Sequence, residues 1–296
     1  KDHKRQNFFL KNKLKDILKE RDFDYIQVEN LCTAPVLEGI KTNSKKIIDF
    51  MEICSYLKNS SKERFLIRKY ERKISKVYDI AICCSEVDKK RLSELGYCNV
   101  FVVPNGVDFI HFKFTKKKPL KNKSEKSLLF VGGLYHKQNF EAVKYFFKKI
   151  YPLLNKDIQI NIIGKCDKSK FIDEKGFENV NFLGFVKDIR SYFENSIFIC
   201  PLLDGGGTRL KILTAFSLGS PVVSTSKGAE GIECFNGGNI LLANSPEAFV
   251  KNINNLLENP TLYKKIRTNA LKLVKEKYLW GSIVKNYNSF LKNITT

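Results

Sequence analysis

Short apolar runs alternate with longer amphipathic stretches along the chain, and from residue 125 onward glycines follow the apolar runs. The runs and their glycines are Leu128–Val131 with Gly132 and Gly133, Ile158–Ile163 with Gly164, Ile197–Leu203 with Gly205, and Val222–Thr225 with Gly228. Within residues 140–154, apolar side chains recur at three- or four-residue spacing, which predicts a helix with one buried side. The repeated order of strand, glycine and helix predicts βα units and a parallel sheet.

The same alternation is less regular in the first part of the chain. It predicts strands at residues 25–28, 46–50, 80–84 and 100–103, after an opening helix at residues 7–19. The lysine-rich stretch at residues 116–126 surrounds a proline and predicts a connector between two domains.

The glycines predict a ligand-binding edge. Parallel strands end at one edge of their sheet, and ligands of open α/β sheets bind there. The strongest segment is the turn that begins at Gly205 and leads into a predicted helix near Thr208. Free N–H groups at a helix start bind anions, and Arg209 and Lys211 add two cations in the first turn. This combination predicts a phosphate site.

Composition narrows the class of protein. The chain has 296 residues, 43% of them hydrophobic, which is enough for about two domains with real cores. It carries 52 Lys and Arg against 31 Asp and Glu, a formal net charge of +21. The lysines are spread over most predicted helices without an arginine-rich arm, so we expect a basic surface and no nucleic-acid partner. Weak peripheral contact with anionic membrane lipid is a further expectation.

Membrane-spanning and metal-binding classes are not predicted. No apolar run reaches the roughly 18 residues that a membrane span requires. The eight cysteines include no Cys-x-x-Cys pair, and the three histidines are scattered. We therefore expect a cytoplasmic protein without a metal site. Where it contacts lipid, we expect it to lie at the inner face of the membrane.

Several motifs together resemble those of glycosyltransferase family 4. They are residues 205–213 (GGGTRLKIL), 219–225 (GSPVVST), 228–231 (GAEG), 130–133 (FVGG) with Asn139, and 104–108 (PNGVD). The resemblance extends over most of the chain and implies the GT-B fold, in which two Rossmann-like α/β domains face a cleft. It implies an acceptor-side domain at residues 1–118, joined by a C-terminal helix at residues 280–296, and a donor-binding domain at residues 119–279.

The resemblance also implies a reaction and its residues. A sugar would pass from a nucleoside diphosphate sugar to a saccharide or lipid-linked acceptor, with retention, and with no cofactor or required divalent metal. Arg209 and Lys211 would neutralise the diphosphate leaving group. The implied donor-binding residues are Gly132, Gly133, Lys137, Gly205, Gly206, Gly207, Thr208, Thr214 and Glu230.

Two departures from the family bear on activity. The family's Glu-x7-Glu pattern falls on Gly206 and Thr214, so a hydroxyl replaces the carboxylate that binds the donor ribose. The chain opens on a helix where the family has a strand and a glycine-rich loop, so we expect a first domain truncated at its N-terminus. The family's histidine near the reaction centre has no counterpart, and Asp49 and Glu52 are the candidates for its place.

These departures keep two alternatives open. One is a GT-B-like protein that binds nucleotide or glycan without efficient transfer. The other is a nucleotide-sugar epimerase on the same scaffold.

Overall fold

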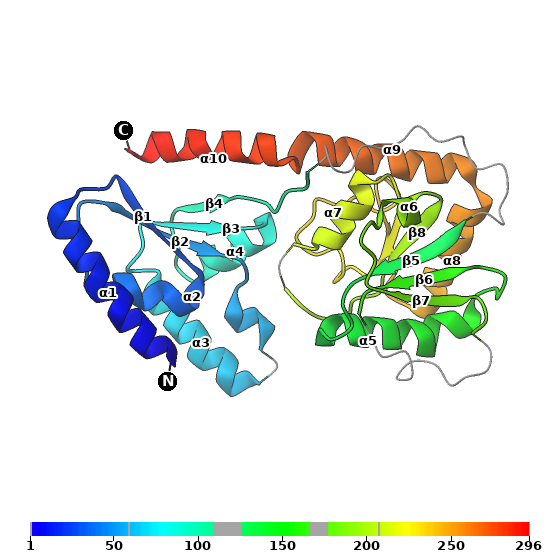
Figure 1. Ribbon diagram of the computed structural model, residues 1–296, viewed down its shortest axis with the longest axis horizontal. Coiled ribbons are helices and arrows are strands. Elements are labelled where there is room, and N and C mark those ends of the chain that lie inside the picture. Colours follow the sequence, from blue (N-terminus) through cyan, green and yellow to red (C-terminus); the bar gives the residue numbers. More distant parts are fainter. Residues whose placement is uncertain (1, 59, 109–125, 166–176, 207, 296) are drawn as a thin grey trace. The chain divides into compact units, whose positions relative to one another are not determined.

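The helices and strands are divided between two units (Figure 1). The computed structural model describes residues 2–58, 60–108, 126–165, 177–206 and 208–295. The first unit comprises residues 1–105, 206–208 and 283–296, and the second comprises residues 106–205 and 209–282. The predicted connector up to residue 125, and with it the expected domain boundary at residue 118, lies outside the described residues. The domain limits expected from the resemblance stay predictions.

The second unit is built on a six-stranded sheet in the order β10-β9-β8-β5-β6-β7. Its strands are β5 (Ser127–Val131), β6 (Ile160–Ile163), β7 (Val180–Gly184), β8 (Ser196–Cys200), β9 (Val222–Ser224) and β10 (Leu241–Leu242). All pairs of neighbouring strands are parallel, which confirms the parallel sheet expected from the βα pattern.

Helices connect these strands and bury the sheet. They are α5 (Lys137–Tyr145), α6 (Arg190–Phe193), α7 (Leu210–Ser217), α8 (Pro246–Glu258) and α9 (Pro260–Lys277). The core contains phenylalanines whose side chains are fully buried, namely Phe130, Phe146, Phe193, Phe198, Phe216 and Phe249. Burial of such rings supplies a large part of the hydrophobic free energy of folding.

The helix expected over residues 140–154 is interrupted. After α5 the chain widens into a π turn, η4 (Phe146–Ile150), and then tightens into a 3₁₀ turn, η5 (Tyr151–Leu153). Pro152 lies in this last turn. Proline has no N–H to donate and its ring clashes with the preceding turn, so the α-helical ladder cannot continue through it.

The order of the strands creates a switch point. From β5 the chain adds β6 and β7 on one side, and it then crosses to the other side of β5 to add β8, β9 and β10. The connections therefore leave β5 and β8 in opposite directions, and the carboxyl ends at such a switch point are where ligands of open α/β sheets bind. Asp204 and Gly205 follow β8, and Gly132 follows β5.

The ends of β5 and β6 approach each other so closely that the position after β6, residue 164, requires glycine. Gly164, which follows β6, has a φ of +141°, and a Cβ there would lie 2.2 Å from the Gly132 carbonyl oxygen. Both the backbone conformation and the contact exclude a side chain.

The first unit contains a four-stranded parallel sheet in the chain order β1-β2-β3-β4. Its strands are β1 (Tyr25–Glu29), β2 (Lys45–Phe50), β3 (Ile80–Cys83) and β4 (Val100–Val102). Its helices are α1 (Asp2–Glu20), α2 (Asn30–Thr33), η1 (Ala34–Leu37), η2 (Cys54–Leu57), α3 (Ser61–Ile74), α4 (Glu86–Glu94) and the part of α10 (Trp280–Thr295) from Ile283 onward.

Each face of this sheet has its own apolar cluster. On one face, side chains of α10 pack against Ile47, Ile80 and Ile82, and Phe290 stacks on Phe101 at a centroid distance of 3.9 Å. The other face packs against side chains of α3, α4 and η1. None of the helices among the described residues is both long and apolar enough to cross a membrane.

Replacement of Gly164 by alanine tests the close approach of β5 and β6. We expect Gly164→Ala to lower the free energy of unfolding of the second unit by about 3 kcal/mol, since the new Cβ meets backbone and the φ is unfavourable. Gly237 is a matched control, because its φ is +74° but a Cβ there meets nothing within 4 Å. Gly237→Ala should cost only about 1 kcal/mol. If Gly164→Ala and Gly237→Ala lowered the free energy of unfolding in urea by the same amount, the steric explanation would be wrong.

Candidate functional site

Lys211 brings an ammonium group to the switch point of the second unit. It lies in the first turn of α7, and its Nζ donates a 2.5 Å hydrogen bond to Oδ1 of Asn139, on α5. Nδ2 of Asn139 in turn donates to the Gly133 carbonyl at 2.9 Å. A Cβ on Gly132 would lie 2.9 Å from the Lys211 Nζ. Lys211 and Gly132, both predicted donor-binding or catalytic positions, therefore lie side by side.

Arg209 holds a second cation at the neighbouring strand end. A Cβ on Gly205, which has a φ of +112°, would lie 2.8 Å from Nη2 of Arg209. The guanidinium thus folds back over the turn, where Nη2 donates to the Asp204 carbonyl at 3.4 Å. The absence of a side chain at Gly205 makes this conformation possible.

The two cations lie in a partly desolvated environment. Burial lowers the pKa of Lys211, and the positive charge of Arg209 adds to that effect. Burial likewise lowers the pKa of Arg209, against the opposing effects of Cys200, Glu230 and Asp204. Charges that have lost part of their hydration interact more strongly with a bound anion than surface charges do.

The start of α7 adds to this positive potential. Its N-cap residue is Arg209, which makes no side-chain capping hydrogen bond, and its first turn contains no acidic residue. The helix begins at Leu210 rather than near Thr208 as expected. The uncapped N-terminus and the two cations together make an anion-binding arrangement.

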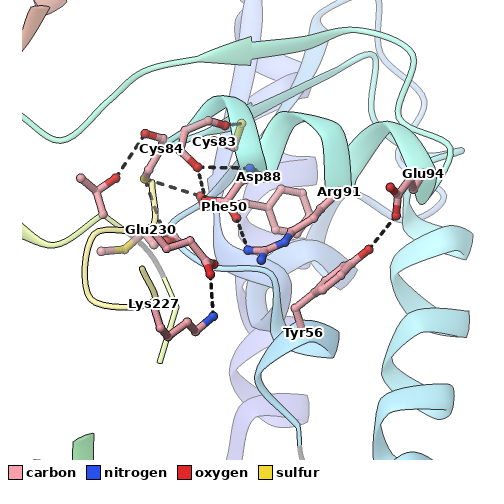
Figure 2. A network of polar contacts seen from close by, with 12 residues as sticks. Phe50, Tyr56, Cys83, Cys84, Asp88, Arg91, Glu94, Lys227 and Glu230 are labelled. Carbon is pink, nitrogen blue, oxygen red and sulfur yellow. Dashed lines mark hydrogen bonds and ion pairs between the residues drawn. The ribbon is translucent and has the colours of Figure 1, made fainter. Parts of the chain in front are cut away.

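The remaining predicted donor residues differ in their surroundings. Glu230 is half-buried and forms an ion pair with Lys227 at 2.7 Å (Figure 2). Lys137 is the exposed first residue of α5, and Thr214 is half-buried on α7. Gly206 and Thr208 are grouped with the first unit, where Thr208 Oγ1 donates to the Cys84 carbonyl at 3.3 Å. Gly207 lies outside the described residues. The roles assigned to these residues stay predictions.

In the first unit, Asp49 lies beside another carboxylate. Asp49 of β2 is in register with Glu29 of β1, so both lie at the carboxyl ends of neighbouring strands. Burial, and secondarily the charge of Glu29, raises the pKa of Asp49 to about 6. Tyr287 of α10 covers this edge and donates a hydrogen bond to Gln27. Glu52, the other acidic candidate, is exposed in the bend after β2.

The segment that follows Glu52 is anchored by two neighbouring helices. In η2, the Tyr56 hydroxyl donates to Glu94 at 2.9 Å, and the Arg91 guanidinium lies 4.8 Å from the Tyr56 ring centroid (Figure 2). The backbone N–H of Ser55 donates to the buried Glu71 carboxylate at 3.1 Å. The chain after Glu52 is thus fixed to both α3 and α4.

Asn139 is a residue of this site that the sequence does not predict. The only sequence signal was its place beside the FVGG motif, and an asparagine at a helix start is usually a cap. Among the described residues, no group of three or more His, Cys, Asp or Glu side chains is arranged to hold a metal ion.

Titration of Asp49 tests the carboxylate pair. Because its pKa is raised above the ordinary 3.8 in the folded state, protonation favours folding, and this contribution is lost as the pH rises from about 4 through 6. We expect carboxyl NMR to show a midpoint near 6, and Glu29→Gln to lower it. Glu52→Gln, which removes an exposed charge from the next segment, is the control. A midpoint that is unchanged in Glu29→Gln would exclude the coupling.

Part of the chain matches a known family of enzymes. Residues 125–259 match the family described as Glycosyl transferases group 1. A Klebsiella pneumoniae protein named "Uncharacterized 44.6 kDa protein in cps region" is 27% identical, over 90% of this chain and 74% of that protein. An uncharacterised glycosyltransferase of Methanocaldococcus jannaschii is 24% identical, over 92% of this chain and 76% of that protein.

A solved structure extends the comparison to the fold. HepE of Anabaena, in complex with UDP, superposes with a TM-score of 0.74 at 14% identity, covering 96% of this chain and 82% of that chain. The parallel sheets and this likeness agree on a GT-B architecture. Residues 125–259 therefore match a glycosyl transferases group 1 domain, and the fold of the chain is that of GT-B glycosyltransferases.

Proposed function

We propose that this protein transfers a sugar from a nucleoside diphosphate sugar to a saccharide or lipid-linked acceptor. The reaction proceeds with retention at the sugar carbon and does not require a divalent metal. The observation that carries the proposal is the placement of Lys211 and Arg209 at the switch point, beside Gly132 and Gly205.

The proposed chemistry follows from charge development. As the bond between sugar and diphosphate breaks, negative charge grows on the leaving phosphate oxygens. Lys211 and Arg209 stabilise that charge, and the free N–H groups at the start of α7 donate to the same oxygens. Because Asn139 already holds the Lys211 ammonium, little reorganisation is needed when the donor binds.

Structural relatives support the donor class. HepE has been solved with UDP and glucose and also with UDP-glucose. These ligands belong to that protein, and they make uridine donors the first to test here. The base and the sugar used by this chain stay open.

On the acceptor side, we assign proton exchange with the acceptor hydroxyl to Asp49, with Glu52 as the less favoured candidate. A carboxyl group with a pKa of about 6 exchanges protons readily near neutral pH. Glu52 is exposed, so its carboxylate lacks the burial that Asp49 has.

A second candidate function rests on Thr214. A hydroxyl at the ribose position binds more weakly than a carboxylate, since a hydrogen bond to a charged group contributes about 1.5–3 kcal/mol. A protein that binds nucleotide or glycan without efficient transfer is therefore the main alternative, and a nucleotide-sugar epimerase is a more distant one.

Substitution of Lys211 tests the phosphate site. We expect Lys211→Ala to weaken UDP binding by about 10- to 150-fold in calorimetric titration, because one charged hydrogen bond is lost. Asn139→Ala should weaken it less, and the double variant should lose less than the sum of the two, since Asn139 acts through Lys211. Lys149→Ala, at an exposed position of the same unit, is the control. Unchanged affinity in Lys211→Ala for UDP, GDP and TDP would refute the site.

A donor panel tests the reaction itself. We expect release of the nucleoside diphosphate from one sugar donor class, accelerated by a saccharide or lipid-linked acceptor, with the anomeric configuration retained by NMR. Conversion of the donor sugar without an acceptor would indicate epimerisation. Nucleotide binding without any turnover would favour the binding protein.

A further inference from the structure

The outer side of α3 carries two large apolar side chains that the fold does not bury. Phe65 is 68% exposed and Leu66 is 55% exposed, although both lie in the middle of a helix. Exposure of single apolar residues is ordinary, but an adjacent aromatic and aliphatic pair exposed on one helix indicates a binding surface.

The inner side of α3 already supplies the contacts that hold the helix in place. Ile74 is buried in the core of the first unit, and the Glu71 carboxylate accepts the Ser55 N–H. Arg64 donates to the Lys58 carbonyl, and Ser60 caps the helix start. Phe65 and Leu66 are therefore not needed to place α3 on its unit.

The residues around this pair are mainly basic. Lys62, Lys69 and Arg72 are exposed at positions three to seven residues away, which places them on the same side of a helix as Phe65 and Leu66. Glu63 is the one acidic residue in the exposed part of α3. The whole chain carries a net charge of +21, so the long-range field also attracts anions.

We propose that the outer face of α3 (Lys62, Phe65, Leu66, Lys69 and Arg72) docks on an anionic lipid bilayer. Apolar side chains flanked by lysines match the boundary of headgroups and acyl chains, where the ammonium groups reach the phosphates and the rings enter the apolar layer. Since the other side of α3 is packed on the unit, only these few side chains penetrate. The contact is therefore reversible and sensitive to salt. It does not depend on the proposed transfer reaction.

Vesicle co-sedimentation of the full chain tests this surface. One set of vesicles contains phosphatidylcholine alone, and the other contains equal parts of phosphatidylcholine and phosphatidylglycerol. We expect binding to the anionic vesicles only, and weaker binding as salt is added. A basic residue near an anionic surface strengthens binding about fivefold, so Lys62→Glu/Lys69→Glu should weaken it at least about tenfold. Phe65→Ser/Leu66→Ser should weaken it about tenfold.

Matched variants elsewhere separate this face from general charge. Lys148→Glu/Lys149→Glu changes two exposed lysines of the second unit, and Phe235→Ser removes a ring that is 71% exposed there. Both should bind like the parent chain, and circular dichroism should show all variants folded. Equal binding to both kinds of vesicle, no binding to either, or equal losses in the second-unit variants would overturn the proposal. A parent dimer that Phe65→Ser/Leu66→Ser dissociates in light scattering would also overturn it, since a second copy would then cover the face.

Discussion

The hydrogen bond between Lys211 and Asn139 is the contact on which the candidate site depends. It fixes an ammonium group from the second half of the domain to the first helix after β5, so it joins the two sides of the switch point. A partly desolvated cation is costly unless it is partnered, and the Asn139 amide oxygen and the Phe130 ring, whose centroid lies 4.7 Å from Nζ, are its neutral partners. Burial and the nearby positive charge of Arg209 both lower the pKa of Lys211.

Glycines make room for this arrangement. The Lys211 ammonium and the Arg209 guanidinium occupy the space in which side chains at Gly132 and Gly205 would stand. Gly164 lets the next strand end approach the same edge. The glycines thus serve a steric purpose, because the two cations occupy space at one crowded edge of the sheet.

The two units are wound differently. The strand order of the second unit reverses at β5 and β8, whereas the described strands of the first unit run in chain order across one sheet. The titratable pair of the first unit instead lies where β1 and β2 end under α10. The hydrogen bonds of Tyr56 with Glu94 and of Ser55 with Glu71 keep η2 in one position on α3 and α4.

Much of the fold and part of the candidate site could be predicted from the sequence. Short apolar runs predicted most strands, period-3.6 patterns predicted most of the longer helices, and the glycines after the strands predicted the ligand edge, because these signals are local. The strands β7 and β10 and the helix α3 were not predicted. β7 includes the polar Asn181, β10 has only two residues, and most side chains of α3 are charged, so none of them contains a long apolar run.

Tertiary structure alone decided which strands are neighbours, that Asn139 meets Lys211, and that Glu29 lies beside Asp49. It also showed Lys126, expected in a connector, to be buried against the end of α8. These facts depend on contacts between residues far apart in the chain, and such contacts are set by packing and strand order, which local sequence does not encode.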